Sequence, residues 1–267
     1  MAVSSVRNSE SSSTASPAGG RLPPGQTPVE GFPRFGTSMY RPPPVVPADP
    51  KITVSGVVSE PIQVAVADLA GMDRRPVVAD FHCVAGWSAL GLRWEGVAFE
   101  NFYRQIIEPA LAPGAAPTHF VFAGLDGWRS LVEIEDALDP DVLIADRLDG
   151  QPLDPAHGAP ARLLSPAQYG FVSTKHLCRI EVHTARPEGL DPTAIRIGPL
   201  TLPNPVVRTH PRARVWQEER HPALPSWAAR RLYRSLVAPI RLVLRAGVSR
   251  PARASESPAE RPSGPVR

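Results

Sequence analysis

Proline constrains this chain more than any other residue type does. Of its 267 residues, 33 are proline, about 12%, whereas proline makes up about 5% of an average protein. Because proline lacks a backbone N–H and has a fixed φ, it interrupts helices and central strands. We therefore expect either a loop-rich fold or long proline-containing tails.

The remaining composition permits a folded core. Apolar residues make up 42% of the chain and charged residues 21%, which is close to globular averages and excludes disorder of the whole chain. The length allows one large domain or two small ones. Because the chain has only two cysteines, a disulfide scaffold and a zinc site built on several cysteines are both excluded.

Charge is distributed unevenly along the sequence. Residues 1–207 carry 16 basic and 22 acidic side chains, whereas residues 208–267 carry 13 arginines and four glutamates. The basic character therefore belongs to the C-terminal tail, which argues against a nucleic-acid-binding domain and in favour of a docking tail. Lysine occurs only as Lys51 and Lys175.

Composition divides the chain into five segments. Residues 1–30 are rich in Ser, Pro and Gly and predict a disordered N-terminus. Residues 31–185 form the expected domain, which begins with a proline-containing arm. A proline-rich extension (186–226), a helix (227–246) and a disordered tail (247–267) are expected to follow. The sequence shows neither a secretory signal nor a run of 18 apolar residues, so the expected compartment is the cytoplasm.

Within the domain, strand-like segments outnumber helical ones. Apolar side chains at helical spacing predict a helix over residues 98–108, and residues 64–72 suit a short strand followed by a short helix. Further strands are expected at residues 51–58, 76–80, 118–122, 130–134, 141–148, 161–164 and 177–183. The sequence has neither GxGxxG nor a P-loop. The pattern therefore predicts an α+β fold with mixed sheets and short helices, flanked by disordered or extended tails.

Residues 227–246 have the pattern of a basic amphipathic helix that Pro239 should kink. One face carries Arg230, Arg234, Arg241 and Arg245, and the opposite face carries Leu232, Leu236, Ile240 and Val243. Helices of this kind lie on anionic membranes or dock on acidic partners. The alternative is that this helix packs on its own acidic domain.

Three segments carry residues suited to chemistry. Cys83 follows a predicted strand in a loop, where functional sites gather, although a lone cysteine is more often a buried apolar residue. Cys178 is expected in the core. Residues 157–162 and 169–176 combine imidazole, guanidinium, hydroxyl and ammonium groups that can bind an anion. The alternative for each is an ordinary polar loop.

Together these segments resemble the sulfite oxidase family of molybdenum–pterin oxidoreductases, in particular its short bacterial members. The resemblance covers about residues 31–185, with the motifs in the family's order and spacing. They are Val54-Ser55-Gly56-Val57-Val58, Phe81-His82-Cys83-Val84 with Trp87-Ser88, Trp94-Glu95-Gly96-Val97, His157-Gly158-x-Pro160-x-Arg162, and Tyr169-Gly170 with Ser173-x-Lys175.

The resemblance implies a fold, a cofactor and a set of site residues. The fold would be the sulfite oxidase-type molybdopterin-binding fold, and the cofactor molybdenum on a pyranopterin (molybdopterin). Cys83 would be the thiolate ligand of the metal, and a metal deprotonates a coordinating thiol. The pterin and its phosphate would be held by His157, Arg162, Ser173 and Lys175, with His82 as a second contact. Tyr169 would take part in catalysis from the substrate cavity, and Arg34 in the arm could reach the cofactor.

The chain also departs from the family pattern. Sulfite-oxidising members place an arginine soon after the ligand cysteine, where it helps to bind the anion. Here Cys83 is followed by Val84, Ala85, Gly86 and Trp87, and Arg93 is the first arginine. Sulfite is therefore not expected as the substrate. Residues 184–267 also lack the sandwich-like strand pattern of members that carry a C-terminal dimerisation domain.

The sequence leaves three functional hypotheses. The first is an oxidoreductase that carries out two-electron oxo transfer on a small-molecule substrate and exchanges electrons with an external electron-transfer protein. The second is a non-catalytic adaptor of the same fold that docks through residues 227–246. The third is a Cys–His hydrolase, which needs a base oriented toward the Cys83 thiol. The third does not explain the order of the other motifs.

Overall fold

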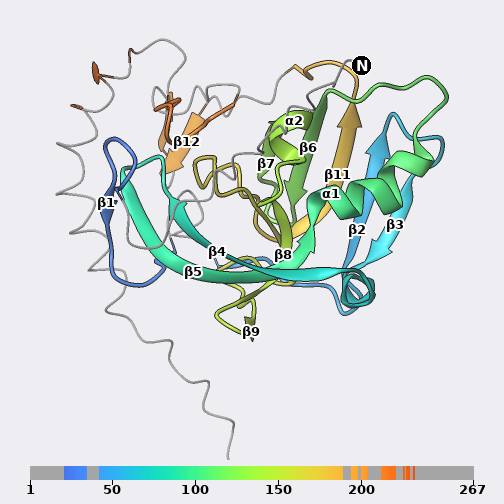
Figure 1. The fold of residues 1–267 in the computed structure, drawn as a ribbon, viewed down its shortest axis with the longest axis horizontal. Coiled ribbons are helices and arrows are strands. Elements are labelled where there is room, and N and C mark those ends of the chain that lie inside the picture. Colours follow the sequence, from blue (N-terminus) through green and yellow to red (C-terminus); the bar gives the residue numbers. More distant parts are fainter. Residues whose placement is uncertain are drawn as a thin grey trace, which may run out of the picture.

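The computed structural model describes residues 21–34, 42–188, 194–197, 200–203, 212–220, 225, 227–228 and 231. Two sheets form the body of these residues, and they lie at an angle to each other (Figure 1). The expected disordered ends at residues 1–20 and 247–267, and most of the helix expected at 227–246, lie outside the described residues. Among the described residues, no helix is both long and apolar enough to cross a membrane.

The first sheet has six strands and is built around one long strand. Its central order is β1-β5-β8-β10, with β4 paired to β5 and β9 paired to β8. The bounds are β1 Thr27–Pro28, β4 Arg74–His82, β5 Trp87–Ala98, β8 Leu143–Leu148, β9 Gln151–Pro152 and β10 Arg162–Leu164. The β1–β5 pair is parallel, and the other pairs of this sheet are antiparallel.

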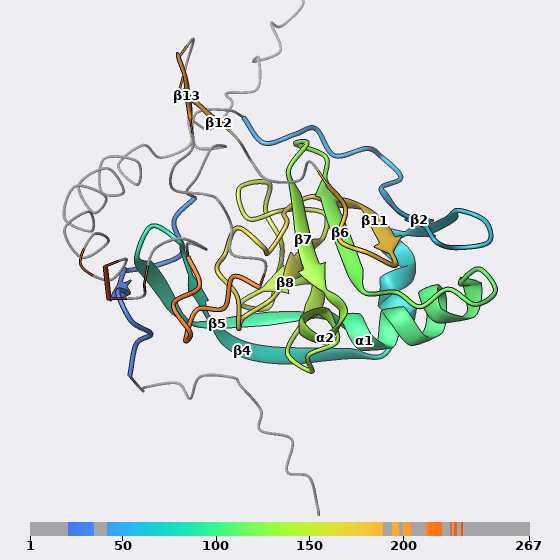
Figure 2. The same ribbon diagram turned by 90° about the horizontal axis from the view of Figure 1, so that it is seen from above.

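The second sheet has five strands in the order β3-β2-β11-β6-β7. Their bounds are β2 Lys51–Gly56, β3 Ile62–Ala65, β6 His119–Gly124, β7 Arg129–Glu133 and β11 Leu177–His183. β2 and β11 pair in parallel, so this sheet is mixed. Seen from above, it stands across the long β4–β5 hairpin (Figure 2). A separate two-stranded pair, β12 Ala194–Ile197 and β13 Leu200–Pro203, follows.

Helical structure is confined to short elements. They are the 3-10 helices η1 Val66–Gly71 and η3 Glu108–Ala110, the π-helical turn η2 Tyr103–Ile107, and the α-helices α1 Phe99–Phe102 and α2 Ile134–Ala137. α1, η2 and η3 run on without a break, which confirms the helix predicted at residues 98–108. Pro109 lies in the first turn of η3, and the helical run ends one residue later, at Ala110. The predicted α+β class, with mixed sheets and short helices, is confirmed.

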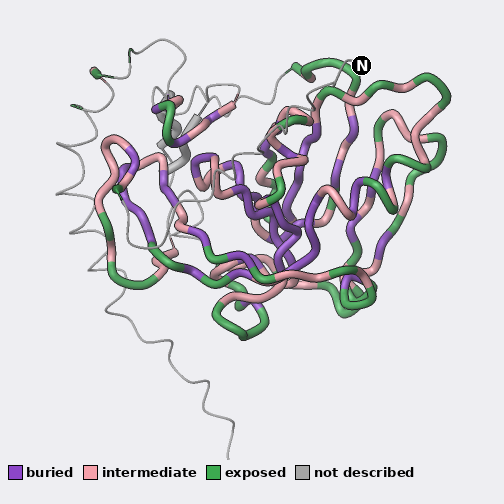
Figure 3. The backbone as a smooth tube through the Cα atoms, in the orientation of Figure 1, coloured by how far each residue is buried: buried purple, intermediate pink, exposed green. Residues whose placement is uncertain are grey.

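Two apolar cores share the strands of the first sheet. In β8, Ile144 packs into the larger core with Phe99, Phe120 and Ile180, whereas Leu143 and Ala145 pack into the smaller core with Trp94. Successive strand residues point to opposite faces, so the sheet is buried on both sides at this point. The buried backbone accordingly gathers where the two sheets meet (Figure 3). Cys83 lies at the edge of the smaller core.

The structure differs from the sequence-based expectation in three places, one of which is the β12–β13 pair in the expected proline-rich extension. β5, with 12 residues, was not expected, because its burial does not alternate and a register shift lies between Glu95 and Gly96. Residues 21–30 were expected to be disordered, yet Thr27 and Val29 donate to the carbonyls of Gly86 and Ser88. That pairing uses backbone groups alone and therefore needs no apolar pattern in the arm.

Candidate functional site

Cys83 sits in the tight turn that joins β4 to β5. Its N–H donates to the Trp87 carbonyl (2.8 Å), and its own carbonyl accepts the Gly86 N–H (2.9 Å). Gly86 has φ +95°, a conformation that favours glycine. The cysteine is 9% exposed. The turn therefore holds a nearly buried thiol in a fixed position.

The surroundings of Cys83 oppose a free thiolate. Burial raises the pKa of the Cys83 thiol to about 12, while a hydrogen bond from the Ala85 backbone and the charge of Arg220 lower it. At neutral pH the thiol is therefore protonated. A transition metal would displace that proton, because a coordinating thiol is deprotonated by the metal.

The N-terminal arm supports the turn from outside the two sheets. The Gln26 side-chain amide donates to the Cys83 carbonyl (3.1 Å) and accepts the Ser88 hydroxyl (3.1 Å). The His82 ring Nδ1 lies 2.8 Å from Ser88 Oγ, and burial lowers the pKa of His82 to about 4. His82 is thus a neutral ring bonded to Ser88, which is not the arrangement that the hydrolase hypothesis needs.

A second group of side chains is cationic and lies near the same turn. Arg162, at the start of β10, is 1% exposed, and it donates to the carbonyls of His157 (2.9 Å) and Ser173 (3.0 Å). Its guanidinium carbon lies 5.3 Å from the ring centroid of Phe81 and 5.1 Å from that of Trp94. Burial lowers its pKa. Among the described residues it forms no ion pair with a carboxylate.

Lys175 extends this cationic group. Its ammonium donates to the Ala156 carbonyl (3.3 Å). Burial lowers its pKa to about 8, with further lowering by Arg162 and Arg34 that the more weakly acting Asp126 and Asp154 oppose. Gly158 has φ +114°, and a Cβ there would lie 3.1 Å from the Lys175 side chain and 3.2 Å from Arg162. Glycine is therefore what lets the two cations approach the 157–158 turn.

The other predicted contacts are engaged within the protein. His157 Nδ1 lies 2.9 Å from an Asp154 carboxylate oxygen, its Nε2 lies 2.8 Å from the Phe32 carbonyl, and its ring stacks on Phe32 at 4.8 Å. The Ser173 hydroxyl accepts the Ser165 N–H (3.1 Å). These contacts within the protein do not test whether His157 or Ser173 also contacts a cofactor.

Tyr169 lies between the cysteine turn and the C-terminal part of the chain. It is fully buried, and its hydroxyl accepts a hydrogen bond from Arg220 Nε (2.9 Å). The next residue, Gly170, donates its N–H to the His82 carbonyl (2.7 Å). A Cβ at Gly170 would lie 2.3 Å from the Phe81 ring, so only glycine lets this segment pack so closely beside the turn.

The structure thus brings the predicted residues together in two adjacent groups. Cys83, His82 and Tyr169 form the first, and Arg162 and Lys175 form the second with His157 and Arg34. Phe81 joins them, because it lies beside the Arg162 guanidinium and packs against both Gly170 and Trp87. The predicted residues of three separate motifs therefore share one region of the fold.

Sequence reasoning missed the residues that the two outer segments contribute. Gln26 comes from a stretch expected to be disordered, and Arg220 and Glu218 come from the expected proline-rich extension. Arg220 donates to the Pro24 carbonyl (3.1 Å) and pairs with Glu218 at 2.9 Å, with both side chains at 0% exposure. The concentration of arginine after residue 208 was the signal in the sequence, but it did not identify which arginine is buried.

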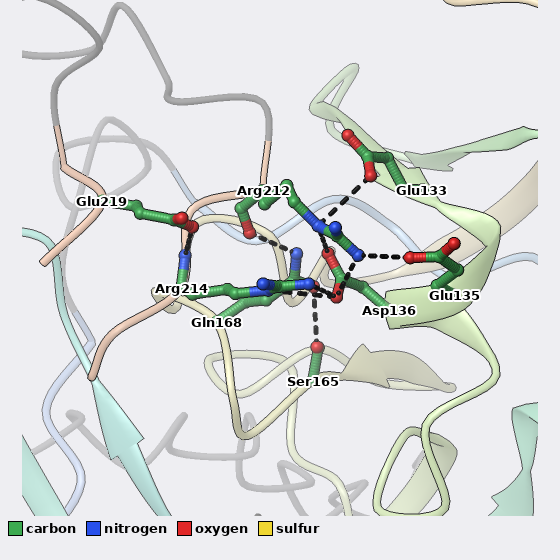
Figure 4. A network of polar contacts seen from close by, with 8 residues as sticks. All are labelled: Glu133, Glu135, Asp136, Ser165, Gln168, Arg212, Arg214 and Glu219. Atoms are coloured by element: carbon green, nitrogen blue, oxygen red, sulfur yellow. Dashed lines mark hydrogen bonds and ion pairs between the residues drawn. The ribbon is translucent and has the colours of Figure 1, made fainter. Parts of the chain in front are cut away.

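An ion-pair network anchors the segment that carries Arg220. Arg212 and Arg214 both reach Asp136 in α2, at 3.0 and 2.9 Å, and Arg212 also reaches Glu135 at 2.9 Å (Figure 4). Gln168 donates to the Arg212 carbonyl (2.6 Å) and accepts the Ser165 hydroxyl (2.8 Å). Residues 212–220 are thereby fixed to the same loop that carries Tyr169.

Comparison with known proteins matches residues 40–190 to the family model described as "Oxidoreductase molybdopterin binding domain". The chain is 31% identical over 167 residues to the uncharacterized oxidoreductase YuiH of Bacillus subtilis, covering 61% of this chain and 79% of that protein. It is 28% identical over 152 residues to the protein-methionine-sulfoxide reductase catalytic subunit MsrP of Xanthomonas campestris, covering 51% of this chain and 46% of that protein.

Two further similarities complete the comparison. The chain is 27% identical over 139 residues to the putative protein-methionine-sulfoxide reductase subunit YedZ1 of Azospira oryzae, covering 52% of this chain and 51% of that protein. It thus spans about half the length of the two sulfoxide reductase relatives. Among solved structures, the sulfane dehydrogenase SoxCD of Paracoccus pantotrophus matches with a TM-score of 0.44 and 20% identity, covering 51% of this chain and 38% of that one.

Proposed function

Because the chain belongs to the oxidoreductase molybdopterin-binding domain family and is a molybdopterin-dependent oxidoreductase, we propose that it catalyses two-electron oxo transfer on a small substrate. The resemblance identified in the sequence is confirmed at the level of the family. The substrate, the chemistry and the electron partner are the parts that we propose.

The donor set fits a molybdenum–pterin cofactor. Arg162 is buried without a carboxylate partner among the described residues, and Lys175 lies close enough for the Arg162 charge to lower the pKa of its ammonium. Two neighbouring cations in a buried site cost free energy unless an anion joins them. A phosphate is such an anion, and arginine and lysine both bind phosphate through charge-assisted hydrogen bonds. This pair, a buried arginine beside a half-buried lysine, is the observation that carries the proposal.

Each residue has a role toward the cofactor. Cys83 would bind the metal through its thiolate, with the Ala85 N–H donating to the sulfur. Arg162 and Lys175 would hold the phosphate end, and His157 and Ser173 would border it. When bound, the cofactor supplies two-electron oxo-transfer chemistry, with molybdenum alternating between Mo(VI) and Mo(IV).

The remaining residues of the site exclude water from it and hold it rigid. His82 stays neutral and holds Ser88, so it adds no charge beside the thiolate. Phe81, Trp87 and Trp94 are part of the smaller core or pack against it, and they keep water from this side of Cys83. In a site of this kind charges interact strongly, because little solvent screens them. Tyr169 offers a hydroxyl near the metal ligand, where it can orient a substrate oxygen.

Electrons would be exchanged with a separate redox protein. In the reducing direction an oxide, two electrons and two protons give the deoxygenated product and water, and the electrons need a donor. Two relatives, YedZ1 and MsrP, are named as subunits of an enzyme, which supports a second component. The adaptor hypothesis rests on residues 227–246, most of which lie outside the described residues.

An isotope experiment tests the oxo-transfer proposal. The purified holoenzyme would be reduced with a viologen dye and supplied with an 18O-labelled oxide, and the released water would be analysed by mass spectrometry. We expect the label to appear in water in the wild-type protein and not in Cys83→Ser. Product without label in the water would contradict direct oxo transfer.

A further inference from the structure

Gln26 lies in the N-terminal arm, before the residues that match the family, and its side chain bonds to the backbone of the cysteine turn. The family match begins at residue 40. The Gln26 amide donates to the Cys83 carbonyl (3.1 Å), and that carbonyl also accepts the Gly86 N–H within the turn (2.9 Å). A carbonyl oxygen has two lone pairs, so Gln26 occupies the acceptor position that the turn itself leaves open.

A second turn, encoded in the sequence of the arm, sets the position of Gln26. The Gln26 N–H donates to the Pro23 carbonyl (3.2 Å), and Gly25 has φ +68°. Proline at the second position and a glycine with positive φ at the third, here Pro24 and Gly25, are typical of a type II turn. Directly after this turn, β1 pairs with β5 through the backbone. The arm is therefore held in place without the Gln26 side chain.

The hydrogen bonds around Gln26 run in one direction. A carbonyl only accepts, so Nε2 of Gln26 faces Cys83, and Oε1 accepts the Ser88 hydroxyl (3.1 Å). That bond uses the one hydroxyl proton of Ser88, so Ser88 Oγ must accept from His82 Nδ1, which lies 2.8 Å away. Neutral His82 therefore carries its proton on Nδ1 and its lone pair on Nε2.

This chain of bonds spans both sides of the cysteine turn and is largely buried. His82 and Ser88 are partners across the β4–β5 pair, and Cys83 lies between them in sequence. Ser88 is 0% exposed and His82 3%. A buried polar group that loses its partner costs free energy, so these three side chains favour a single arrangement of the turn.

We propose that Gln26 is a positioning residue for Cys83, because it fixes the carbonyl of the cysteine turn and, through Ser88, the tautomer of His82. This inference rests on the proposed function, in which Cys83 is the metal ligand. Partners that orient a ligand residue tune the metal site, and a ligand held by locked neighbours keeps its geometry. Gln26 acts through Cys83 and is not itself a catalytic residue.

The tautomer of His82 tests the proposal without the cofactor. Nitrogen-15 NMR of the metal-free full-length chain would identify the protonated ring nitrogen, with His82→Gln assigning the signals. We expect Nδ1–H in wild type. In Gln26→Met the Ser88 hydroxyl loses its acceptor and can donate to Nδ1, so His82 should move toward the Nε2–H form. Gln26→Glu at pH 8 keeps an acceptor for Ser88 and should keep the wild-type tautomer. A Gln26 that only fills space would leave the tautomer unchanged in both variants.

The alkylation rate of Cys83 in the metal-free chain tests the other end of the bond chain. Because Cys83 is nearly buried, iodoacetamide reaches it when the turn opens. Gln26→Met should raise the Cys83 rate about fivefold, as expected for the loss of one hydrogen bond. Cys178 in β11 is the internal reference. Thr27→Val, next to Gln26 in the arm, keeps the backbone pairing and is the matched control, which should leave both rates unchanged.

The holoenzyme shows whether this positioning reaches the metal. Gln26→Met should contain as much molybdenum as wild type, because the pterin keeps its own contacts. Its thiolate-to-metal absorption band should shift, since the sulfur is held less firmly. Thr27→Val should have the wild-type band.

The outcomes are distinct. A wild-type tautomer and Cys83 rate in Gln26→Met, an Nε2–H form in wild type, or an unchanged absorption band in Gln26→Met would overturn the inference. If Gln26→Met does not fold, Ser88→Ala takes its place, and a His82 that stays wholly Nδ1–H without the Ser88 hydroxyl would overturn it as well. If the metal-free results are as expected but the chain takes up no molybdenum, the proposed function fails while the effect of Gln26 on Cys83 stands.

Discussion

At the residue scale, the two cysteines differ in what surrounds them. Cys83 is held in a tight turn beside a cationic group, whereas Cys178 is half-buried in β11 and donates weakly to the Ala123 carbonyl (3.4 Å). We expect Cys83→Ser to abolish turnover while the pterin stays bound, because the pterin keeps its own protein contacts. Cys178→Ser should leave activity unchanged at a modest cost in stability. Activity and pterin content measured on both variants check this, and full turnover in Cys83→Ser would remove Cys83 as the ligand.

Arg162 and Lys175 should act on cofactor occupancy more than on rate. A charge-assisted hydrogen bond is worth about 1.5–3 kcal/mol, so Arg162→Ala or Lys175→Ala should weaken cofactor binding roughly 10- to 150-fold. Molybdenum content and the rate per bound molybdenum would be measured separately. Arg104→Ala is the control, since that side chain is 67% exposed and pairs with Glu100 in its own helical segment. Full occupancy with slow turnover would place the two residues at the substrate instead.

Lys175 also predicts how the stability of the cofactor-free protein depends on pH. Its pKa is lowered to about 8 by burial, Arg162 and Arg34, so the folded chain binds its proton less tightly than the unfolded chain does. The lowered pKa makes the folded state less stable below pH 8. This loss of stability decreases as the pH rises toward the pKa of lysine in the unfolded chain, near 10.4. Lys175→Met should therefore be more stable than wild type at pH 7, by roughly 1–2 kcal/mol after allowance for partial exposure.

Denaturant unfolding at pH 7 and pH 9.5 measures that effect. The advantage of Lys175→Met should shrink at the higher pH, whereas Lys51→Met, at an exposed lysine paired with Asp49, should show little change at either. A stability difference for Lys175→Met that is the same at both pH values would contradict a buried, charged Lys175.

At the scale of elements, residues 212–220 are held to α2 by Asp136. The neighbouring acids raise the pKa of Arg212, with Asp136 as the largest cause. We expect Asp136→Asn to cost about 1–3 kcal/mol and to expose residues 212–220 to protease. Limited proteolysis with mass spectrometry would locate the cleavage. Glu100→Gln, which breaks an exposed pair worth about 0.3–0.5 kcal/mol, should leave the pattern unchanged, and equal cleavage in both variants would contradict the anchoring role.

Elements with a clear apolar period were predictable from sequence, and elements held by pairing were not. β2 alternates buried and partly exposed residues, and Ile52 and Val54 identified it. β5 is buried on both faces and shifted in register, so no single period describes it. β1 is two residues long and joins the sheet through its backbone.

The residues of the candidate site divide in the same way into those that the sequence predicted and those that it did not. Cys83, Arg162, Lys175 and Tyr169 were found because they stand in motifs with fixed spacing. Gln26, Glu218 and Arg220 contact the same region from distant segments, and a contact between residues 24 and 220 leaves no local signal.

At the scale of the whole molecule, the structure places the start of the basic tail after residue 220. The charge asymmetry began at residue 208, but Arg212, Arg214 and Arg220 are part of the domain's packing. Residues 221–267, with nine arginines and two glutamates, are the remaining candidate for docking. Truncation after Arg220 should leave molybdenum content and the melting temperature unchanged and should slow reduction by an acidic partner at low salt, an effect that salt abolishes.

Truncation after residue 207 is the informative comparison. It also removes the anchored segment, so it should lower the melting temperature by roughly 2–4 °C for each kcal/mol lost. If the shorter truncation, after Arg220, already lowers the melting temperature strongly and causes aggregation, the helix predicted at residues 227–246 packs on the domain and the docking proposal is wrong.

The central claim is that Cys83 binds molybdenum in a site whose cations hold the pterin phosphate. Metal analysis and a visible spectrum of the full-length protein, purified from a host that makes the cofactor, test it most directly. We expect one molybdenum per chain and a thiolate-to-metal charge-transfer band that Cys83→Ser abolishes while the pterin remains. A metal-free wild-type chain from that host, or a band that survives in Cys83→Ser, would contradict the account.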